Sequence, residues 1–444
     1  MMVQDRNTTK WISTVPEHWK TLRIKNLFAE IDERSETGEE ELLSVSHYTG
    51  VTKKRDSLEN EDDFISSAKT LVGYKKVAEN DLVSNIMLAW NGSLGISKYD
   101  GITSPAYCVY RIKGENNPHY YGYLFSTAIM KAEFRKKSFG IIDSRLRLYS
   151  DKFFSIPVAV PPKVEQDQIV FYIKAQSKKI KHFIQKKQAF IELLKEQRQA
   201  VISRAVTRGI NPNATLKYSG IEWLGEIPAH WEVRRIKNIC SVISKGTTPS
   251  TMGTDTIENG SIRFLKAENL YSNNISLQPS FFIDEETDKI LFRSRLELND
   301  VLIVIAGATL GRTGIVTEEV LPANTNQAIC FIRPKEVNSE FLQMWLQTPY
   351  INSLIWLNAT QAAQPNLAMG KIAEFKILYP PMNDQQEVVE FIKQETINID
   401  TTISKAEKEI ELIKEYREAM IAEAVLGKLH HKIIKPEVCQ TTSL

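Results

Sequence analysis

Two stretches of the chain carry apolar side chains at the a and d positions of a heptad repeat. One runs from about residue 165 to 206, and the other reproduces its steps of four, seven, four, seven, three, seven and four 219 residues later. Neither contains Pro or Gly, so each predicts a helix of roughly 40 residues, about 60 Å long. The positions predicted to pair the two helices are Ile173, Ile180, Ile184, Ile191, Ile392, Ile399, Ile403 and Ile410.

The charges beside this apolar pattern indicate which helix pairs with which. Residues 171–210 hold ten basic and two acidic side chains, whereas residues 391–428 hold six basic and eight acidic ones. Opposite signs favour pairing within one chain, while two copies of the first helix would repel. We expect antiparallel pairing, because a duplicated unit closes most simply around a pseudo-two-fold axis. The excess of lysine on the first helix could also simply solvate its exposed face, and this interpretation is compatible with the pairing.

The rest of the sequence is also built twice. Trp11–Ile31 and Trp223–Ile243 share nine identities in 21 positions at an offset of 212, and Asn80-Asp81 returns as Asn299-Asp300 at an offset of 219. The second copy therefore carries a net insertion of seven residues. A period above 200 residues is too long for a solenoid, so the pattern indicates a duplicated domain pair.

The segment before each helix is predicted to be an α+β domain. Short β-branched or aromatic runs predict strands, and two helical patterns are visible. The strands are expected at Ala106–Ile112, Ser261–Leu265, Leu302–Ile305 and Ala328–Ile332, and the helices at Tyr120–Lys136 and Ser339–Trp356.

The predicted architecture is therefore α+β: two globular domains of duplicated fold, separated by an antiparallel coiled coil of two long helices with pseudo-two-fold symmetry. The predicted segments are a first domain (1–160), a first long helix (161–210), a linker with the second domain (211–379), a second long helix (380–428) and a tail (429–444).

Composition excludes several classes of protein. With 42% hydrophobic and 25% charged residues, the chain is expected to fold, and its longest apolar run, Val301–Ala308, is too short to cross a bilayer. The first residues show no secretory signal, so we expect a cytoplasmic protein whose four separated cysteines are free thiols. The net charge of +2 decides nothing about nucleic acid, although residues 1–220 carry +9 and the remainder −7.

No catalytic motif is visible. The sequence lacks a P-loop, HExxH and GxSxG, and residues 307–314 (GATLGRTG) lack the lysine that binds nucleotide phosphate. The recurring His18 and His230 belong to the repeated frame, which favours a structural role. We expect no metal and no catalysis. One alternative is a free-standing nuclease using dispersed carboxylates such as Asp284–Lys289, and another is an assembly scaffold that does not touch DNA.

Leu42–Val77 of the first copy has little in common with Gly246–Leu296 of the second copy. Within a repeated frame, such a difference indicates that the two copies perform the same operation on different targets. Basic clusters there could neutralise phosphates or read guanine, and amides could pair with adenine. In the first copy the candidate DNA-binding residues are Lys53, Lys54, Arg55, Tyr74, Lys75, Lys76, Arg135, Lys136, Lys137, Arg145 and Arg147. In the second copy they are Lys245, Thr247, Thr248, Lys266, Arg293, Arg295, Arg312, Asn324, Asn326, Gln361 and Gln364, and Asn358 supplies a further amide.

Several motifs together resemble the specificity (S) subunit of type I restriction-modification systems. They are Trp-x-x-x-[Val/Ile]-Pro-x-His-Trp at 11–19 and 223–231, Lys-Gly-Thr-Thr-Pro at 245–249, Asn-Asp followed by an apolar strand and Gly-x-x-Gly, Ala-Asn-Thr-Asn-Gln at 323–327, and Pro-Pro leading into Glu165-Gln166 or Asp384-Gln385. The first copy departs from the pattern, with Ser104-Pro105-Ala106-Tyr107 near the position of Asn-x-Asn-Gln.

This resemblance implies two target-recognition domains, each reading one half of a bipartite, asymmetric site in double-stranded DNA. It also implies that the helices dock two methyltransferase (M) subunits, and that motor-nuclease (R) subunits join the complex. S-adenosylmethionine, ATP and Mg²⁺ would belong to those partner subunits and not to this chain.

Overall fold

The structure is a computed structural model that describes residues 11–46, 49–54, 70–142, 145–360 and 363–433. The chain divides into two compact units. Unit 1 consists of Met1–Lys187 and Lys408–Leu444, and unit 2 of Gln188–Glu407. Both boundaries fall inside long helices, so each unit contains one part of each helix.

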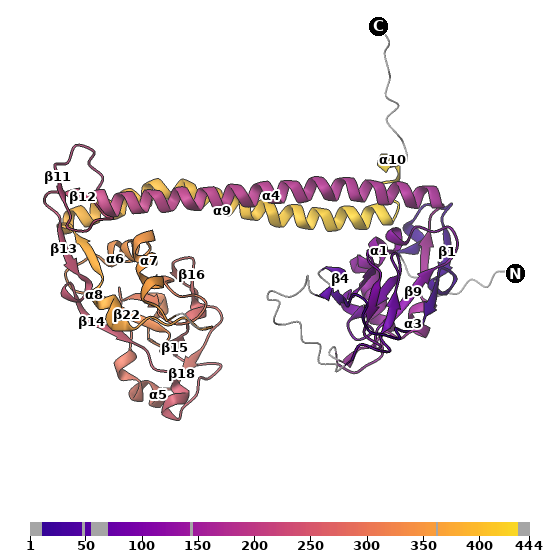
Figure 1. Ribbon diagram of the computed structural model, residues 1–444, viewed down its shortest axis with the longest axis horizontal. Helices are drawn as coiled ribbons and strands as arrows, with labels where there is room; N and C mark the ends of the chain where they lie inside the picture. Colours follow the sequence, from indigo (N-terminus) through magenta and orange to yellow (C-terminus); the bar gives the residue numbers. More distant parts are fainter. Residues whose placement is uncertain (1–10, 47–48, 55–69, 143–144, 361–362, 434–444) are drawn as a thin grey trace, which may run out of the picture. The chain divides into compact units, whose positions relative to one another are not determined.

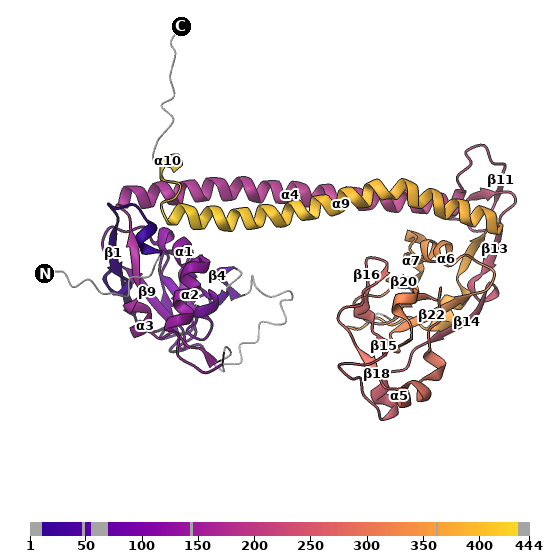
Figure 2. The same cartoon turned by 180° about the vertical axis from the view of Figure 1, so that it is seen from behind.

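The long helices are α4 (Lys163–Arg208) and α9 (Met382–Val425), and in both units the start of one lies beside the end of the other (Figures 1 and 2). In unit 1, Ile173 of α4 shares a core with Met420 of α9. In unit 2, Val206 near the end of α4 shares a core with Val388 near the start of α9. The helices therefore pair antiparallel within each unit, which confirms the prediction.

Apolar positions form the contact between these helices, and charges flank it. Of the eight predicted pairing positions, Ile184 and Ile403 are half-buried and the other six are buried. Lys187 Nζ lies 2.5 Å from Glu409 in unit 1, and Arg198 Nε lies 2.8 Å from Asp400 in unit 2. Each ion pair joins a base of α4 to an acid of α9. Such exposed pairs contribute about 0.2–1 kcal/mol each, so burial of the apolar positions dominates.

The domain in each unit is built on the same four-stranded antiparallel sheet. In unit 1 the strand order is β2 (Phe28–Ile31), β9 (Cys108–Ile112), β6 (Leu82–Ser84) and β7 (Leu94–Ile96); in unit 2 it is β14 (Cys240–Lys245), β22 (Ile329–Pro334), β19 (Val301–Val304) and β20 (Thr313–Ile315). A separate two-stranded ladder joins β1 (Lys20–Arg23) to β10 (Pro157–Val160) and, in the second copy, β13 (Glu232–Arg235) to β23 (Lys376–Tyr379). The matching order confirms the duplication.

The units differ in the strands beside that sheet. Unit 1 has β3 (Leu43–Ser46) paired with β4 (Gly50–Lys53), and β5 (Lys75–Val77) paired with β8 (Gly101–Thr103). Unit 2 has a three-stranded sheet of β18 (Phe282–Ile283), β15 (Ile262–Leu265) and β21 (Ala323–Thr325), and a short hairpin of β16 (Leu270–Tyr271) and β17 (Asn274–Ile275). The four predicted strands overlap β9, β15, β19 and β22.

Both predicted domain helices are confirmed in place, but each proves to be two helices, so the expectation of one continuous helix was wrong. The pairs are α1 (Pro118–Ser126) with α2 (Ala128–Lys137), and α6 (Ser339–Leu346) with α7 (Pro349–Asn358). Thr127 and Thr348 are extended, and their side chains accept hydrogen bonds from the backbone N–H groups of Met130 and Ile351. A threonine N-cap starts a new helix even where the apolar pattern continues.

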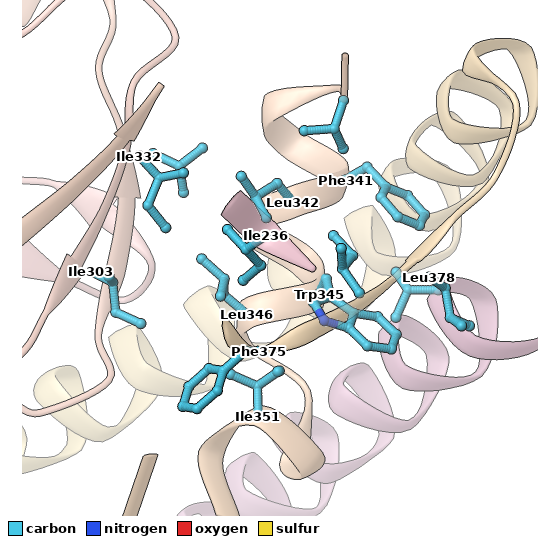
Figure 3. Close-up of a cluster of buried hydrophobic side chains, with 14 of the residues drawn as sticks. Ile236, Ile303, Ile332, Phe341, Leu342, Trp345, Leu346, Ile351, Phe375 and Leu378 are labelled. Carbon is cyan, nitrogen blue, oxygen red and sulfur yellow. The ribbon is translucent and has the colours of Figure 1, made fainter. Parts of the chain in front are cut away.

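The core of unit 2 joins the sheet to the helices (Figure 3). Phe341 and Trp345 of α6 are fully buried in one cluster with Ile303 and Ile332 of the sheet. The Trp345 indole N–H donates to the backbone carbonyl of Lys376, 3.1 Å away. Because Val388 and Ile392 of α9 belong to the same cluster, the domain and its helix fold as one body.

The remaining described elements are short. They are α3 (Ser150–Ser155), α5 (Glu285–Ile290), α8 (Met369–Glu374), α10 (His430–Ile433), β11 (Leu216–Tyr218) and β12 (Glu226–Pro228), together with several 3-10 turns. Within the described ranges, none of the helices has the length and apolar character needed to span a membrane.

Replacing Ile173 by Ala tests the helix contact. Ile173 is fully buried, so we expect the substitution to lower the free energy of unfolding of unit 1 by about 2–5 kcal/mol, measured by urea denaturation. Phe171→Ala is the matched control, since Phe171 lies on the same helix and is 76% exposed; its effect should stay within about 0.5 kcal/mol. Equal effects of the two substitutions would contradict the assigned contact.

Candidate nucleic-acid interface

The first turn of each long helix is held to its domain by a carboxylate. In unit 1, Glu165 accepts hydrogen bonds from the Trp19 indole (2.9 Å) and pairs with His18 (2.8 Å). In unit 2, Asp384 accepts from the Trp231 indole at 3.0 Å. His230 lies 2.6 Å from the same Asp384 oxygen. We call His18, Trp19 and Glu165 the first clamp, and His230, Trp231 and Asp384 the second clamp.

A buried glutamine follows each clamp carboxylate. The side-chain oxygen of Gln166 accepts from the backbone N–H of Asn117 at 2.8 Å, and that of Gln385 accepts from Asn338 at the same distance. Asn117 and Asn338 are the N-caps of α1 and α6. The acid–glutamine pairs noted in the sequence therefore fix the long helix to the domain and to the helix that covers the sheet.

The electrostatics of the second clamp favour an ionised acid. Burial alone would raise the pKa of Asp384, but hydrogen bonds from His230 and Trp231, and the charge of His230, outweigh it. The pKa of Asp384 therefore lies below its ordinary value of 3.8. A carboxylate in the first turn also interacts favourably with the helix dipole.

In unit 2 the structure brings two of the sequence motifs together. The backbone N–H of Thr247, in the Lys-Gly-Thr-Thr-Pro motif, donates to the carbonyl of Thr325 in the Ala-Asn-Thr-Asn-Gln motif at 3.1 Å. A Cβ on Gly246 would lie 1.9 Å from that carbonyl oxygen, so only glycine permits the approach. Asn326 then donates its backbone N–H to Leu265 at 3.1 Å, next to Lys266.

We call the candidate residues around this junction the unit 2 cluster: Lys245, Thr247, Thr248, Lys266 and Asn326. Lys245 is exposed, and the other four are half-buried. The Lys266 ammonium lies 3.4 Å from the centre of the Phe281 ring, which fixes its long side chain by a cation–π contact. These residues combine positive charge with hydroxyl and amide groups on one part of the domain.

The other candidate DNA-binding residues of unit 2 are not part of the unit 2 cluster. Arg312 is exposed and donates to the Leu270 carbonyl at 3.2 Å, while Arg295 pairs with Asp288 at 2.5 Å. Arg293 and Gln364 are exposed, and Gln361 lies outside the described residues.

Asn324 does not reach the surface. It is fully buried; its amide N–H donates to Asp288 at 2.6 Å, and its oxygen accepts from Ser294 at 2.9 Å. Asn358 donates to its own helix at Leu354. Among the alternative nuclease carboxylates, Asp284 caps α5, and Asp288 is already bonded to Arg295 and Asn324.

In unit 1, three of the lysine candidates lie beside carboxylates. Lys53 lies 3.3 Å from Glu41, and Lys76 4.0 Å from Glu40. Lys75 is buried and lies 3.5 Å from Asp32. Tyr74 and Lys54 are half-buried, and Arg55 lies outside the described residues.

The remaining unit 1 candidates lie in the last turn of α2 and in the segment that follows it. Arg135, Lys136, Arg145 and Arg147 are exposed, and Lys137 is half-buried. Phe139 and Arg147 form a backbone bridge, so residues 139–142 and 145–147 are the two arms of a hairpin, and residues 143 and 144 between them lie outside the described part of the chain. Exposed Phe139 and Ile141 on this hairpin were missed in the sequence, where only the basic residues were noted; comparing it with the second copy would have revealed them.

Two unlike surfaces carried on one repeated frame, each fixed to a pair of long helices, define a class of two-site recognition proteins. The chain belongs to the family of type I restriction modification DNA specificity domains, whose sequence profile matches residues 16–193 and again 228–412.

Individual relatives agree with this family. The chain is 24% identical over 434 residues to the type I restriction enzyme MjaVIII specificity subunit of Methanocaldococcus jannaschii, covering 94% of each sequence. It is also 24% identical over 276 residues to the EcoBI specificity subunit of Escherichia coli, covering 61% of this chain and 58% of that one. A chain from a structural study of type I R-M complex assembly and conformational transition shares the fold, with a TM-score of 0.63 and 14% identity over 93% of this chain and 98% of that chain.

Replacing Asp384 by Asn tests the clamp through pH. Because its folded-state pKa is lowered, ionised Asp384 stabilises unit 2 above about pH 4, and this contribution disappears as the pH falls through the folded-state pKa. We expect Asp384→Asn to be less stable at pH 7 and to show a smaller further loss between pH 5 and pH 3, measured by urea midpoints.

Glu387→Gln removes the same charge from an exposed position on the same helix and serves as the control. It should follow the wild-type acid curve. If Asp384→Asn also follows that curve, the clamp acid does not contribute as described.

Proposed function

We propose that this chain is the sequence-specific DNA-recognition subunit of a type I restriction-modification complex, and that each domain reads one half of a bipartite, asymmetric site in double-stranded DNA. The observation that supports this most directly is the shared frame with unlike surfaces. The sheets, clamps and helix contacts repeat, whereas the strands beside each sheet and the polar and basic side chains near them differ between the units. Two domains of the same fold would thereby recognise different DNA sequences.

The chemistry of these surfaces supports a division of work. Exposed arginines and lysines neutralise phosphates and set the position on the duplex, while side chains that reach base edges distinguish the sequence. In unit 2, Lys266 and Asn326 are the candidates for base contact. Buried Asn324 instead supports the domain from within.

The chain's relatives also support a place in a larger complex. We propose that α4 and α9 dock two methyltransferase subunits that carry S-adenosylmethionine and methylate adenine N6. Motor-nuclease subunits, using ATP and Mg²⁺, would join through that complex. This chain would supply recognition and spacing without catalysis, in the cytoplasm where the DNA is.

Mapping methylated adenines in cells that carry this chain with its methyltransferase tests the proposal. We expect a single bipartite motif with two unlike halves and a fixed gap. Lys266→Ala should change methylation only in the half read by unit 2. Methylation that does not depend on the chain, or a one-part motif, would overturn the proposal.

Salt-dependent binding separates recognition from an assembly scaffold. The purified complex should bind duplex DNA with an affinity that falls steeply between 50 and 200 mM salt, by about 10³–10⁵-fold for six to ten phosphate contacts. Binding that does not change with salt would favour the scaffold. Cleavage of plasmid by the chain alone with Mg²⁺ would favour the nuclease.

Removing one heptad from both helices tests whether they set the gap. Deleting Ile184–Phe190 from α4 and Ile403–Glu409 from α9 keeps the apolar pattern, because Ile191 and Ile410 take the vacated positions. Seven residues span about 10 Å, or roughly three base pairs, so we expect a shorter gap between unchanged half-sites in the methylation map. An unchanged gap would contradict a spacing role.

A further inference from the structure

The hairpin of β16 and β17 in unit 2 is fixed in place by its neighbours. Its turn residues, Ser272 and Asn273, both have positive φ, +50° and +62°, which is the geometry of a tight two-residue turn. The Gln343 side chain of α6 donates to the Asn273 carbonyl at 2.7 Å. A Cβ on Gly314 of β20 would lie 2.8 Å from a side-chain carbon of Ile275, so glycine there allows the hairpin to pack closely against the sheet.

The hairpin is also tied to the unit 2 cluster. Buried Asn269 precedes β16, and its side-chain oxygen accepts from the backbone N–H of Lys266 at 2.9 Å. Its side-chain amide donates to the carbonyl of Ser276, just after β17, at 3.0 Å. In Figures 1 and 2, β15 and β16 lie along the same side of unit 2, away from β13 and β14. Because Lys266 directly follows β15, the cluster and the hairpin can contact one duplex.

Tyr271 and Arg312 are the exposed groups at this hairpin. Tyr271 is 65% exposed, and the Arg312 guanidinium lies 5.7 Å from the centre of its ring. Nη1 of Arg312 donates to the Leu270 carbonyl at 3.2 Å. Arg312 makes no other hydrogen bond or ion pair with the described residues, so the edge formed by Nε and Nη2 presents parallel donors to a ligand.

Arg312 occupies a position that the two copies use differently. Gly92 and Gly311 are equivalent glycines at an offset of 219, and both have positive φ, +94° and +86°. The next residue is buried Ser93 in unit 1 and exposed Arg312 in unit 2. The turn therefore belongs to the repeated frame, whereas the arginine belongs to one copy alone. A residue that distinguishes the target of unit 2 from that of unit 1 must differ in this way.

We propose that Arg312 reads a guanine in the half-site of unit 2, donating to O6 and N7 in the major groove, and that Tyr271 is the positioning residue for this contact. The bidentate pair of arginine with guanine needs a fixed guanidinium plane, whereas a phosphate contact needs only charge. The Tyr271 ring and the Leu270 carbonyl fix that plane. The inference rests on the proposed function, because it assumes that unit 2 binds DNA.

The test uses the purified complex of the full chain with its methyltransferase, and duplexes that carry the mapped site with 7-deazaguanine in place of each guanine in turn. This base lacks the N7 acceptor. At one position we expect the wild-type complex to bind the modified duplex about tenfold or more weakly than the unmodified one, measured by competition in fluorescence anisotropy. Arg312→Ala should bind these two duplexes equally, because the group that reads N7 is gone.

Matched variants separate base reading from charge and from folding. Arg312→Lys keeps the charge but not the planar donors, so it should also lose the discrimination. Tyr271→Phe keeps the ring and should keep the discrimination, whereas Tyr271→Ala should diminish it. Arg293→Ala removes another exposed arginine of unit 2 and should leave the discrimination unchanged. Because all three positions are exposed, thermal unfolding should stay the same in every variant.

The possible failures have different meanings. If the wild-type complex binds its site but no 7-deazaguanine weakens binding, or if Arg312→Ala keeps the discrimination, Arg312 does not read guanine and the proposed function stands. The same conclusion follows if Arg312→Ala weakens binding to every duplex by one factor, which is the result expected of a phosphate contact. If the wild-type complex does not prefer its site over an unrelated duplex, the proposed function fails as well.

Discussion

The antiparallel contact between α4 and α9 is the constraint on which the rest of the structure depends. Each domain is clamped to the first turn of its own helix, and the side chains that cover that helix come from the end of the other one. Neither copy of the duplicated sequence therefore completes a unit alone. Burial along the contact provides the stability, while ion pairs such as Lys187–Glu409 match a base of one helix with an acid of the other.

Function follows from what the duplication kept and what it changed. The kept part is mechanical: sheet order, clamp, buried glutamine and helix contact. The changed part is chemical: a junction of hydroxyl, amide and lysine groups around Lys266 in unit 2, and an apolar hairpin among arginines in unit 1. A recognition subunit benefits when the features that support the fold are distinct from the side chains that contact DNA. A change in the supporting features affects both domains, whereas a change in one surface alters recognition by one domain.

The sequence predicted the frame well because its signals are periodic and occur twice. The heptad positions and the Pro-Pro boundary were sufficient for the helices, and the charges beside them for their pairing within one chain. The antiparallel direction was predicted from the pseudo-two-fold symmetry that a duplicated unit favours. Thr127 and Thr348 were missed as helix starts, because the apolar pattern continues across each cap. Surface candidates were less predictable: Asn324 and Lys75 have the right chemistry but are buried, and burial depends on strands that only the fold brings together.

The composition of the unit 1 core determines when this unit can finish folding during synthesis. Its core takes in Met420, Ile421 and Ala424, and the buried Tyr120 hydroxyl donates to the carbonyl of Val425 at 3.0 Å. A ribosome that has finished the first domain must still translate all of Gln188–Glu407 before those residues emerge, which takes about 10–40 s. Throughout that interval the nascent chain presents an uncovered apolar stripe on α4, and the first domain to be synthesised is the last to be finished.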